Sequence, residues 1–148
     1  MASRAENVTV FPGVAPGAPT VDASIRCATT LGRLRRCARR SHLAPRLDLE
    51  SLCARRAEAP DDGDFWGVAL IQTAARDRPL VFHAAAADRP SGAECWLGRL
   101  VEAVRAGDED SARFICERHL DRRARRLALT FAQRLAEAIA REGETRAA

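Results

Sequence analysis

The sequence predicts an all-α protein: a single small helical domain of about five to seven helices that follows a flexible N-terminal tail. Apolar residues recur at intervals of three and four along most of the chain, as they do on one face of a helix. Alanine is abundant, aromatic residues make up 5% of the chain and tyrosine is absent, which is typical of a thin helical core. The length of 148 residues suits one domain.

The helical domain is predicted over residues 21–142, after the flexible tail of residues 1–20 and before a disordered C-terminus over 143–148. Three prolines and two glycines in the tail disfavour regular structure. The first helix is predicted over about 21–40, with Thr20 or Asp22 as its cap. A helical wheel separates its arginines from a narrow apolar stripe and so predicts a basic amphipathic helix. The stripe consists of Cys27, Leu31, Leu34 and Ala38.

Three elements are expected in the middle of the chain. A second helix is predicted over about 48–59, and a third over about 65–75. Three acids, Asp61, Asp62 and Asp64, precede the third helix and suit a helix N-terminus. A short fourth helix is predicted over about 79–87, because four consecutive alanines favour it. A strand over residues 80–83 is the alternative.

Capping residues mark the remaining helices. Ser91 and Glu94 have the spacing of a capping box, and Gly107 is placed to end the helix that follows. The next helix is predicted from about 108 to 119. Asp121 is expected to cap a last helix that reaches about residue 141, unless these two helices are continuous. The predicted core contains Leu31, Leu34, Leu52, Phe65, Trp66, Leu70, Trp96, Leu100, Val104, Ile115, Leu127, Phe131 and Leu135.

One basic segment indicates the class of partner. Residues 23–47 contain seven arginines and no acid, and residues 21–60 carry a net charge of +5 in a chain of net charge +4. An unneutralised arginine surface attracts anions, and guanidinium groups bind phosphate in a bidentate manner. The predicted anionic-partner-binding residues are Arg33, Arg35, Arg36, Arg39 and Arg40, extended by Arg122, Arg123 and Arg126.

Nucleic acid and an acidic protein surface are both compatible with this pattern. No aromatic residue is interleaved with the arginines for base stacking, and no zinc-finger or helix-turn-helix pattern surrounds them. Membrane contact is not expected, because the apolar stripe is narrow and no apolar run is long enough to cross a bilayer. All 24 basic residues are arginine. The alternative is therefore that coding bias produces a solvated arginine face, which binds no partner.

The five cysteines indicate a second hypothesis. They are odd in number, form no C-x-x-C pair and follow no signal peptide, so a reducing, cytoplasmic setting is expected. Cys37 lies among four arginines, which are expected to lower its pKa and make it the candidate residue of a thiol-based redox sensor. The alternative is a small, inert residue at the edge of the packed face.

The sequence gives no sign of an enzyme, a cofactor or a metal site. The absence of lysine excludes Schiff-base chemistry and a P-loop lysine, and no nucleophile-elbow, zinc-protease or phosphate-loop motif is present. Cys116 and His119 have metal-ligand spacing, but zinc requires two further ligands that the spacing does not supply.

One segment resembles a known family. Residues 100–110, followed by Arg118-His119-Leu120 and Arg126-Leu-Ala-Leu129, are similar to the opening helices of region 2 in small sigma factors. The similarity covers about a fifth of the chain, and the promoter-reading helix that follows in that family has no counterpart in the printed sequence. The resemblance implies a partner in the transcription machinery.

The leading functional prediction is therefore a non-enzymatic regulatory or binding protein that contacts an anionic partner, nucleic acid or an acidic protein surface. The alternatives are the redox sensor and a structural subunit of a larger assembly, whose broad C-terminal apolar stripe packs on a partner chain. The sequence does not predict an oligomeric state.

Overall fold

The computed structural model describes residues 21–44, with side chains from residue 28, and residues 63–147. These residues form five helices and no strand: α1 (Val21–Leu43), α3 (Gly63–Ala74), α4 (Gly92–Arg105), α5 (Glu109–His119) and α6 (Arg122–Ala147). The all-α prediction is confirmed. The predicted tail over 1–20 and the predicted helix over 48–59 lie outside the described residues.

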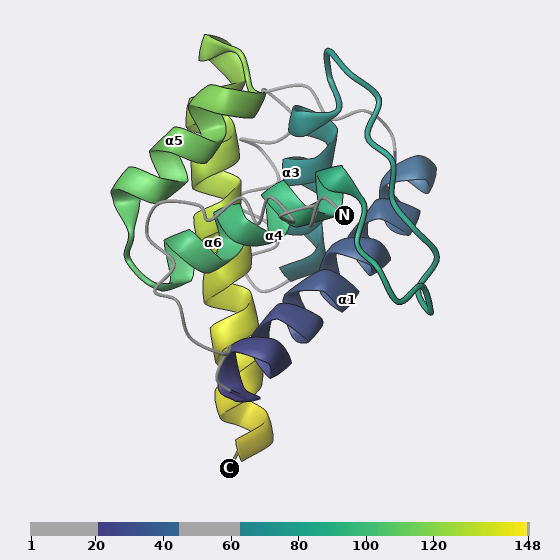
Figure 1. Ribbon diagram of the computed structural model, residues 1–148, viewed down its shortest axis with the longest axis vertical. Helices are drawn as coiled ribbons and strands as arrows, with labels where there is room; N and C mark the ends of the chain where they lie inside the picture. The colour runs from purple at the N-terminus through teal and green to yellow at the C-terminus, as the bar shows by residue number, and fades with distance from the viewer. Residues whose placement is uncertain (1–20, 45–62, 148) are drawn as a thin grey trace, which may run out of the picture.

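The helices pack around α3 and α6 (Figure 1). α3 packs against α1 on one side and α6 on the other, while α4 contacts α1, α5 and α6. Apolar residues occupy every face of α3, which is the pattern of a helix enclosed by neighbours. The core is confirmed at Leu34, Trp66, Leu70, Leu100, Phe131 and Leu135, whereas Phe65, Trp96, Val104, Ile115 and Leu127 are partly buried against it.

The predicted caps set the bounds of the last three helices. Ser91 and Glu94 form the complete capping box of α4, and Gly107 has the positive φ of 71° that a non-glycine residue rarely adopts. Leu120 is extended and separates α5 from α6, so the two helices are not continuous. The backbone N–H of Ala124 donates to the Asp121 side chain, which caps α6. α6 continues to Ala147, so residues 143–147 are helical where the sequence predicts disorder.

The segment between α3 and α4 corrects the prediction of a fourth helix. Residues 79–87 form neither a helix nor a strand. The guanidinium of Arg35 donates to the backbone oxygens of Ala85, Ala87 and Arg89. These carbonyls bind a side chain from α1, so the contact from a distant part of the chain outweighs the local helix propensity of alanine.

No helix in the described ranges is long and apolar enough to cross a membrane.

Candidate anion-binding surfaces

The arginines of the predicted α1 face are partly buried and partly exposed in the structure. Arg33 and Arg35 are 8% and 5% exposed, so both are removed from the surface on which the sequence places them. The cause is that α1 packs against α3 and α4 at once, which buries a wider arc than its apolar stripe. The buried arc contains Thr30, Arg33, Leu34, Arg35, Cys37 and Ala38.

Arg35 forms a buried ion pair with Glu94 of α4. Its Nε and Nη2 atoms lie 3.2 and 3.1 Å from the two carboxylate oxygens of Glu94. Burial raises the pKa of Glu94, but the hydrogen bonds from Arg35 and from the backbone of His83 and Ser91 outweigh it and lower the pKa. Arg35 therefore holds the 79–91 segment against α1, and it is a structural residue.

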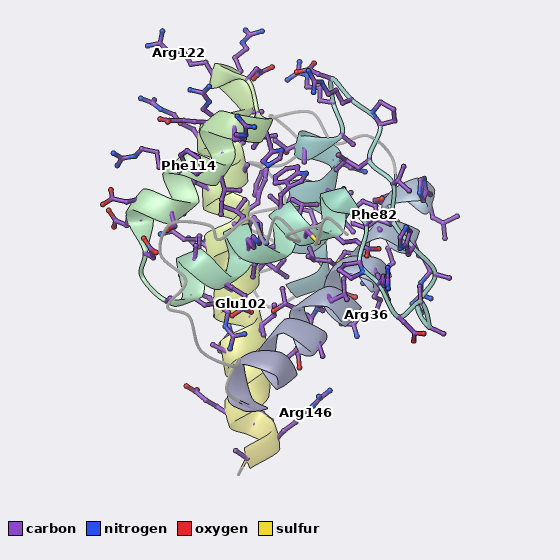
Figure 2. All side chains as sticks on the ribbon, in the orientation of Figure 1. Arg36, Phe82, Glu102, Phe114, Arg122 and Arg146 are labelled. Carbon is purple, nitrogen blue, oxygen red and sulfur yellow. The ribbon has the colours of Figure 1, made fainter. Side chains whose placement is uncertain are left out.

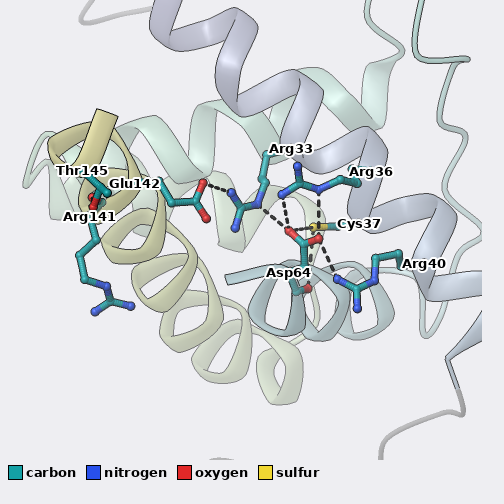
Figure 3. A network of polar contacts seen from close by, with 8 residues as sticks. All are labelled: Arg33, Arg36, Cys37, Arg40, Asp64, Arg141, Glu142 and Thr145. Carbon is teal, nitrogen blue, oxygen red and sulfur yellow. Dashed lines mark hydrogen bonds and ion pairs between the residues drawn. The ribbon is translucent and has the colours of Figure 1, made fainter. Parts of the chain in front are cut away.

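Three arginines of α1 converge on Asp64 at the start of α3 (Figure 3). Arg36 donates to both carboxylate oxygens at 3.0 and 2.7 Å, and Arg40 donates to one at 2.8 Å. The Nε of Arg33 lies 2.7 Å from Asp64 Oδ1 as an ion pair without hydrogen-bond alignment. Burial raises the pKa of Asp64, but these arginines outweigh it and lower the pKa below its ordinary value of 3.8.

The Asp64 network extends to the last helix. Arg33 also forms an ion pair with Glu142 of α6, so one guanidinium lies between acids from two helices. Burial lowers the pKa of Arg33, but Glu142 and Asp64 outweigh it and raise the pKa. The positive charge that the sequence assigns to an external partner is therefore largely neutralised by acids within the protein.

The prediction that the pKa of Cys37 is lowered, and its thiol therefore reactive, is wrong. Its side chain is fully buried beneath the Asp64 network, with Sγ 3.8 Å from the backbone oxygen of Asp64. Burial and the charge of Asp64 raise the pKa of Cys37 to about 12, against the opposing effect of the surrounding arginines. Because a protonated, enclosed thiol is a poor nucleophile, this environment is the opposite of that of a redox sensor.

The part of α1 that stays accessible is small. The side chains of Arg36 and Arg40 are about half exposed while they contact Asp64, and Arg39 is exposed. Of the five α1 arginines predicted to bind an anionic partner, Arg39 alone is exposed without a contact to Asp64 or Glu94.

A second arginine cluster lies where α5 ends and α6 begins. Arg122, Arg123 and Arg126 are exposed as predicted, and the structure adds Arg118 from the last turn of α5. Within the described residues none of these four side chains forms an ion pair. We refer to Arg118, Arg122, Arg123 and Arg126 as the corner arginines.

The turn that carries the corner arginines is held by specific contacts. Arg125 donates to the backbone oxygens of Leu120 and Glu117, which satisfies carbonyls at the end of α5. Leu120 is buried, and Asp121 caps α6. The corner arginines therefore project from a fixed scaffold.

The two arginine clusters do not form one surface. Arg122 lies at the top of the molecule and Arg36 on its right side in Figure 2. The sequence pattern places Arg122, Arg123 and Arg126 as an extension of the α1 cluster, but the fold separates them. The sequence prediction omits Arg118, because the helix break at Leu120 interrupts the periodicity that would relate Arg118 to the arginines of α6.

A concavity that the sequence does not indicate adjoins the corner arginines. Its volume is about 300 Å³, and it lies between the end of α3 and the α5–α6 turn. The imidazole of His119 lines it and stacks on Trp96 of α4, with ring centroids 4.6 Å apart and planes inclined by 7°. The lining residues are Thr73, Ala74, Asp77, Arg78, Arg118, His119, Leu120, Asp121 and Ala124.

Cys116 and His119 belong to different environments despite their spacing. Cys116 is buried, and burial raises its pKa to about 11, whereas His119 is exposed. In the described ranges no three histidine, cysteine, aspartate or glutamate side chains are grouped so that they could hold a metal ion.

Comparisons with protein-family models, with curated proteins and with solved structures give no match. The resemblance to region 2 of sigma factors therefore stays a prediction from sequence.

Proposed function

We propose that this protein is a non-enzymatic binding protein that contacts an anionic partner through the corner arginines. The observation that carries the proposal is that Arg118, Arg122, Arg123 and Arg126 are exposed on a fixed turn, with no ion pair to a described acid. Four neighbouring positive charges attract anions and accelerate the association of an anionic partner.

The position of Arg122 and Arg123 in the first turn of α6 favours a binding function over a stabilising one, whereas Arg118 lies in the last turn of α5, where a positive charge suits the helix dipole. The first turn of α6 contains no acid, although acidic residues stabilise a helix N-terminus and basic residues oppose its dipole. Repulsion among the arginines adds a further cost to folding. The N-cap carboxylate of Asp121 offsets part of the first cost, and an anionic partner would relieve the remainder of both.

The accessible part of α1 supports the proposal less strongly. Asp64 and Glu94 neutralise charges there that the sequence leaves unpaired. We therefore place the principal contact at the corner arginines and treat Arg36, Arg39 and Arg40 as secondary.

Fluorescence anisotropy with two labelled polyanions, a single-stranded oligonucleotide and polyglutamate, tests the proposal. The corner variant replaces Arg118, Arg122, Arg123 and Arg126 with Ala, a strong helix former. A control variant replaces four other exposed arginines, Arg89, Arg113, Arg141 and Arg146, and so loses the same charge. Circular dichroism confirms that both variants fold.

The wild type is expected to bind at least one of the two probes, and the corner variant is expected to bind it at least tenfold more weakly than the control variant. Equal losses in the two variants would show that net charge alone attracts the probe. Failure of the wild type to bind either probe at low salt would overturn the proposal.

A further inference from the structure

Side chains of opposite charge line the concavity beside the corner arginines. Asp77 and Asp121 line it together with Arg78 and Arg118, and the remaining corner arginines follow on the outer surface of α6. The neighbouring Asp121 side chain raises the pKa of Asp77. Two acids and two arginines line the hollow, so their formal charges balance, whereas Arg122, Arg123 and Arg126 beyond it add net positive charge.

His119 gives the concavity a flat aromatic surface. Its ring is held parallel to the indole of Trp96, so the plane of the imidazole is fixed before any ligand arrives. The ring is exposed and lines the hollow. Flat side chains of this kind, histidine included, are those on which unpaired nucleobases stack in protein–nucleic acid complexes.

The two features together match one class of ligand. A nucleobase is neutral, flat and carries N–H groups that carboxylate oxygens accept, as the cytosine amino group does with aspartate and glutamate. A volume of about 300 Å³ is at the lower end of the range for small-ligand pockets and suits a single base. An acidic stretch such as polyglutamate has no flat, neutral group to place on the ring of His119.

We infer that the concavity is a base-stacking subsite, and that the anionic partner of the corner arginines is single-stranded nucleic acid. One unpaired base stacks on His119, its N–H groups face Asp77 and Asp121, and the flanking phosphates contact Arg118 and Arg122. This inference rests on the proposed function and specifies its partner.

The experiment compares a single-stranded oligonucleotide rich in adenine and cytosine with inorganic polyphosphate of equal phosphate number. The two probes share the phosphate charge and differ in the bases. The variant His119→Ala removes the stacking surface, and His42→Ala removes an exposed histidine of α1 as the matched control. His119→Phe restores an aromatic ring on Trp96.

The wild type is expected to bind the oligonucleotide more tightly than polyphosphate. The variant His119→Ala should lose about fivefold or more in oligonucleotide affinity, the size of one stacking contact, with polyphosphate binding unchanged. His119→Phe and His42→Ala should both bind the oligonucleotide within about twofold of the wild type. The carbon-bound proton signals of the His119 ring should shift on addition of the oligonucleotide and stay unshifted with polyphosphate.

Other outcomes separate the inference from the proposed function. Equal binding of both phosphate probes, with no effect of His119→Ala, would leave the corner arginines as a phosphate surface and overturn the base subsite. Preference for polyglutamate over the oligonucleotide would identify an acidic protein partner and overturn the inference alone. Absence of binding to all three polyanions would overturn both.

Discussion

At the scale of single residues, the partner of each arginine decides what that arginine does. Arg35 and Glu94 are both buried and satisfy one another, and Arg35 also binds three backbone oxygens. Arg39 lies one turn further along the same helix and is exposed. Two arginines that the sequence groups together therefore have different roles.

Replacing Arg35 with Ala is expected to destabilise the protein by about 3–5 kcal/mol, because Glu94 would stay buried without its partner. Replacing Arg39 with Ala is expected to change stability by less than about 0.5 kcal/mol, as for most surface substitutions. Urea unfolding of the two variants measures both effects. Similar stability of the two variants would contradict the buried ion pair.

Cys37 is expected to resist alkylation in the native protein. Its burial and its pKa of about 12 leave almost no accessible thiolate at neutral pH. Cys95 is exposed and serves as the internal reference. Peptide-level mass spectrometry after a short iodoacetamide pulse should find Cys95 modified and Cys37 unmodified until denaturant is added. Equal labelling of the two residues would show that the site opens.

At the scale of elements, the approach of α1 to α3 depends on a residue without a side chain. A Cβ atom built at Gly67 overlaps Cys37 Sγ and lies 3.1 Å from Cys37 Cβ. Glycine at this position therefore allows the two helices to approach closely enough for Arg36 and Arg40 to reach Asp64. The small residues at this contact position the polar network above them.

Gly67→Ala is expected to cost about 1–3 kcal/mol through overpacking. Cys37→Ala removes the overlapping sulfur, so the double variant should be more stable than Gly67→Ala alone. A double-mutant cycle from urea unfolding measures this coupling. If the double variant loses the sum of the stability losses of the two single variants, the helices adjust without contact between these residues.

At the scale of the whole molecule, a few buried carboxylates join helices that are distant in sequence. Asp64 joins α3 to α1, Arg33 carries the network to Glu142 of α6, and Glu94 joins α4 to α1. The pKa values of Asp64 and Glu94 lie below their ordinary values of 3.8 and 4.5. Folding stability is therefore linked to the ionisation of both groups.

The pKa values of both carboxyl groups are lower in the folded protein than in the unfolded chain. Their contribution to stability is therefore fully present at pH values above the unfolded-state pKa values, and it is lost as pH falls through the folded-state pKa values. The free energy of unfolding should therefore decline below about pH 4.5, near the ordinary values of these groups. Asp64→Asn should make this decline shallower while lowering stability at pH 7. Urea unfolding over a pH series checks both effects. An equally steep loss of stability at acid pH in the wild type and the variant would contradict the role of Asp64.

Local signals predicted the fold well, whereas contacts between distant segments determined the site. The capping box at Ser91 and the cap at Asp121 were predictable because each acts within one helical turn. The burial of Arg35 was not, since its partner lies 59 residues away and no spacing rule relates them. The concavity at His119 requires two segments, 73–78 and 118–124, that meet only in the folded chain.

The salt dependence of oligonucleotide affinity for the wild type, the corner variant and the control variant tests the role of the corner arginines most directly. Each contact with a single-strand phosphate contributes about 0.7 to the slope of log affinity against log salt concentration. Loss of the four corner arginines should lower the magnitude of that slope by up to about 3, and the control variant should retain the wild-type slope. A corner variant with the wild-type slope, or a control variant with an equally reduced one, would contradict a phosphate-binding surface at this turn.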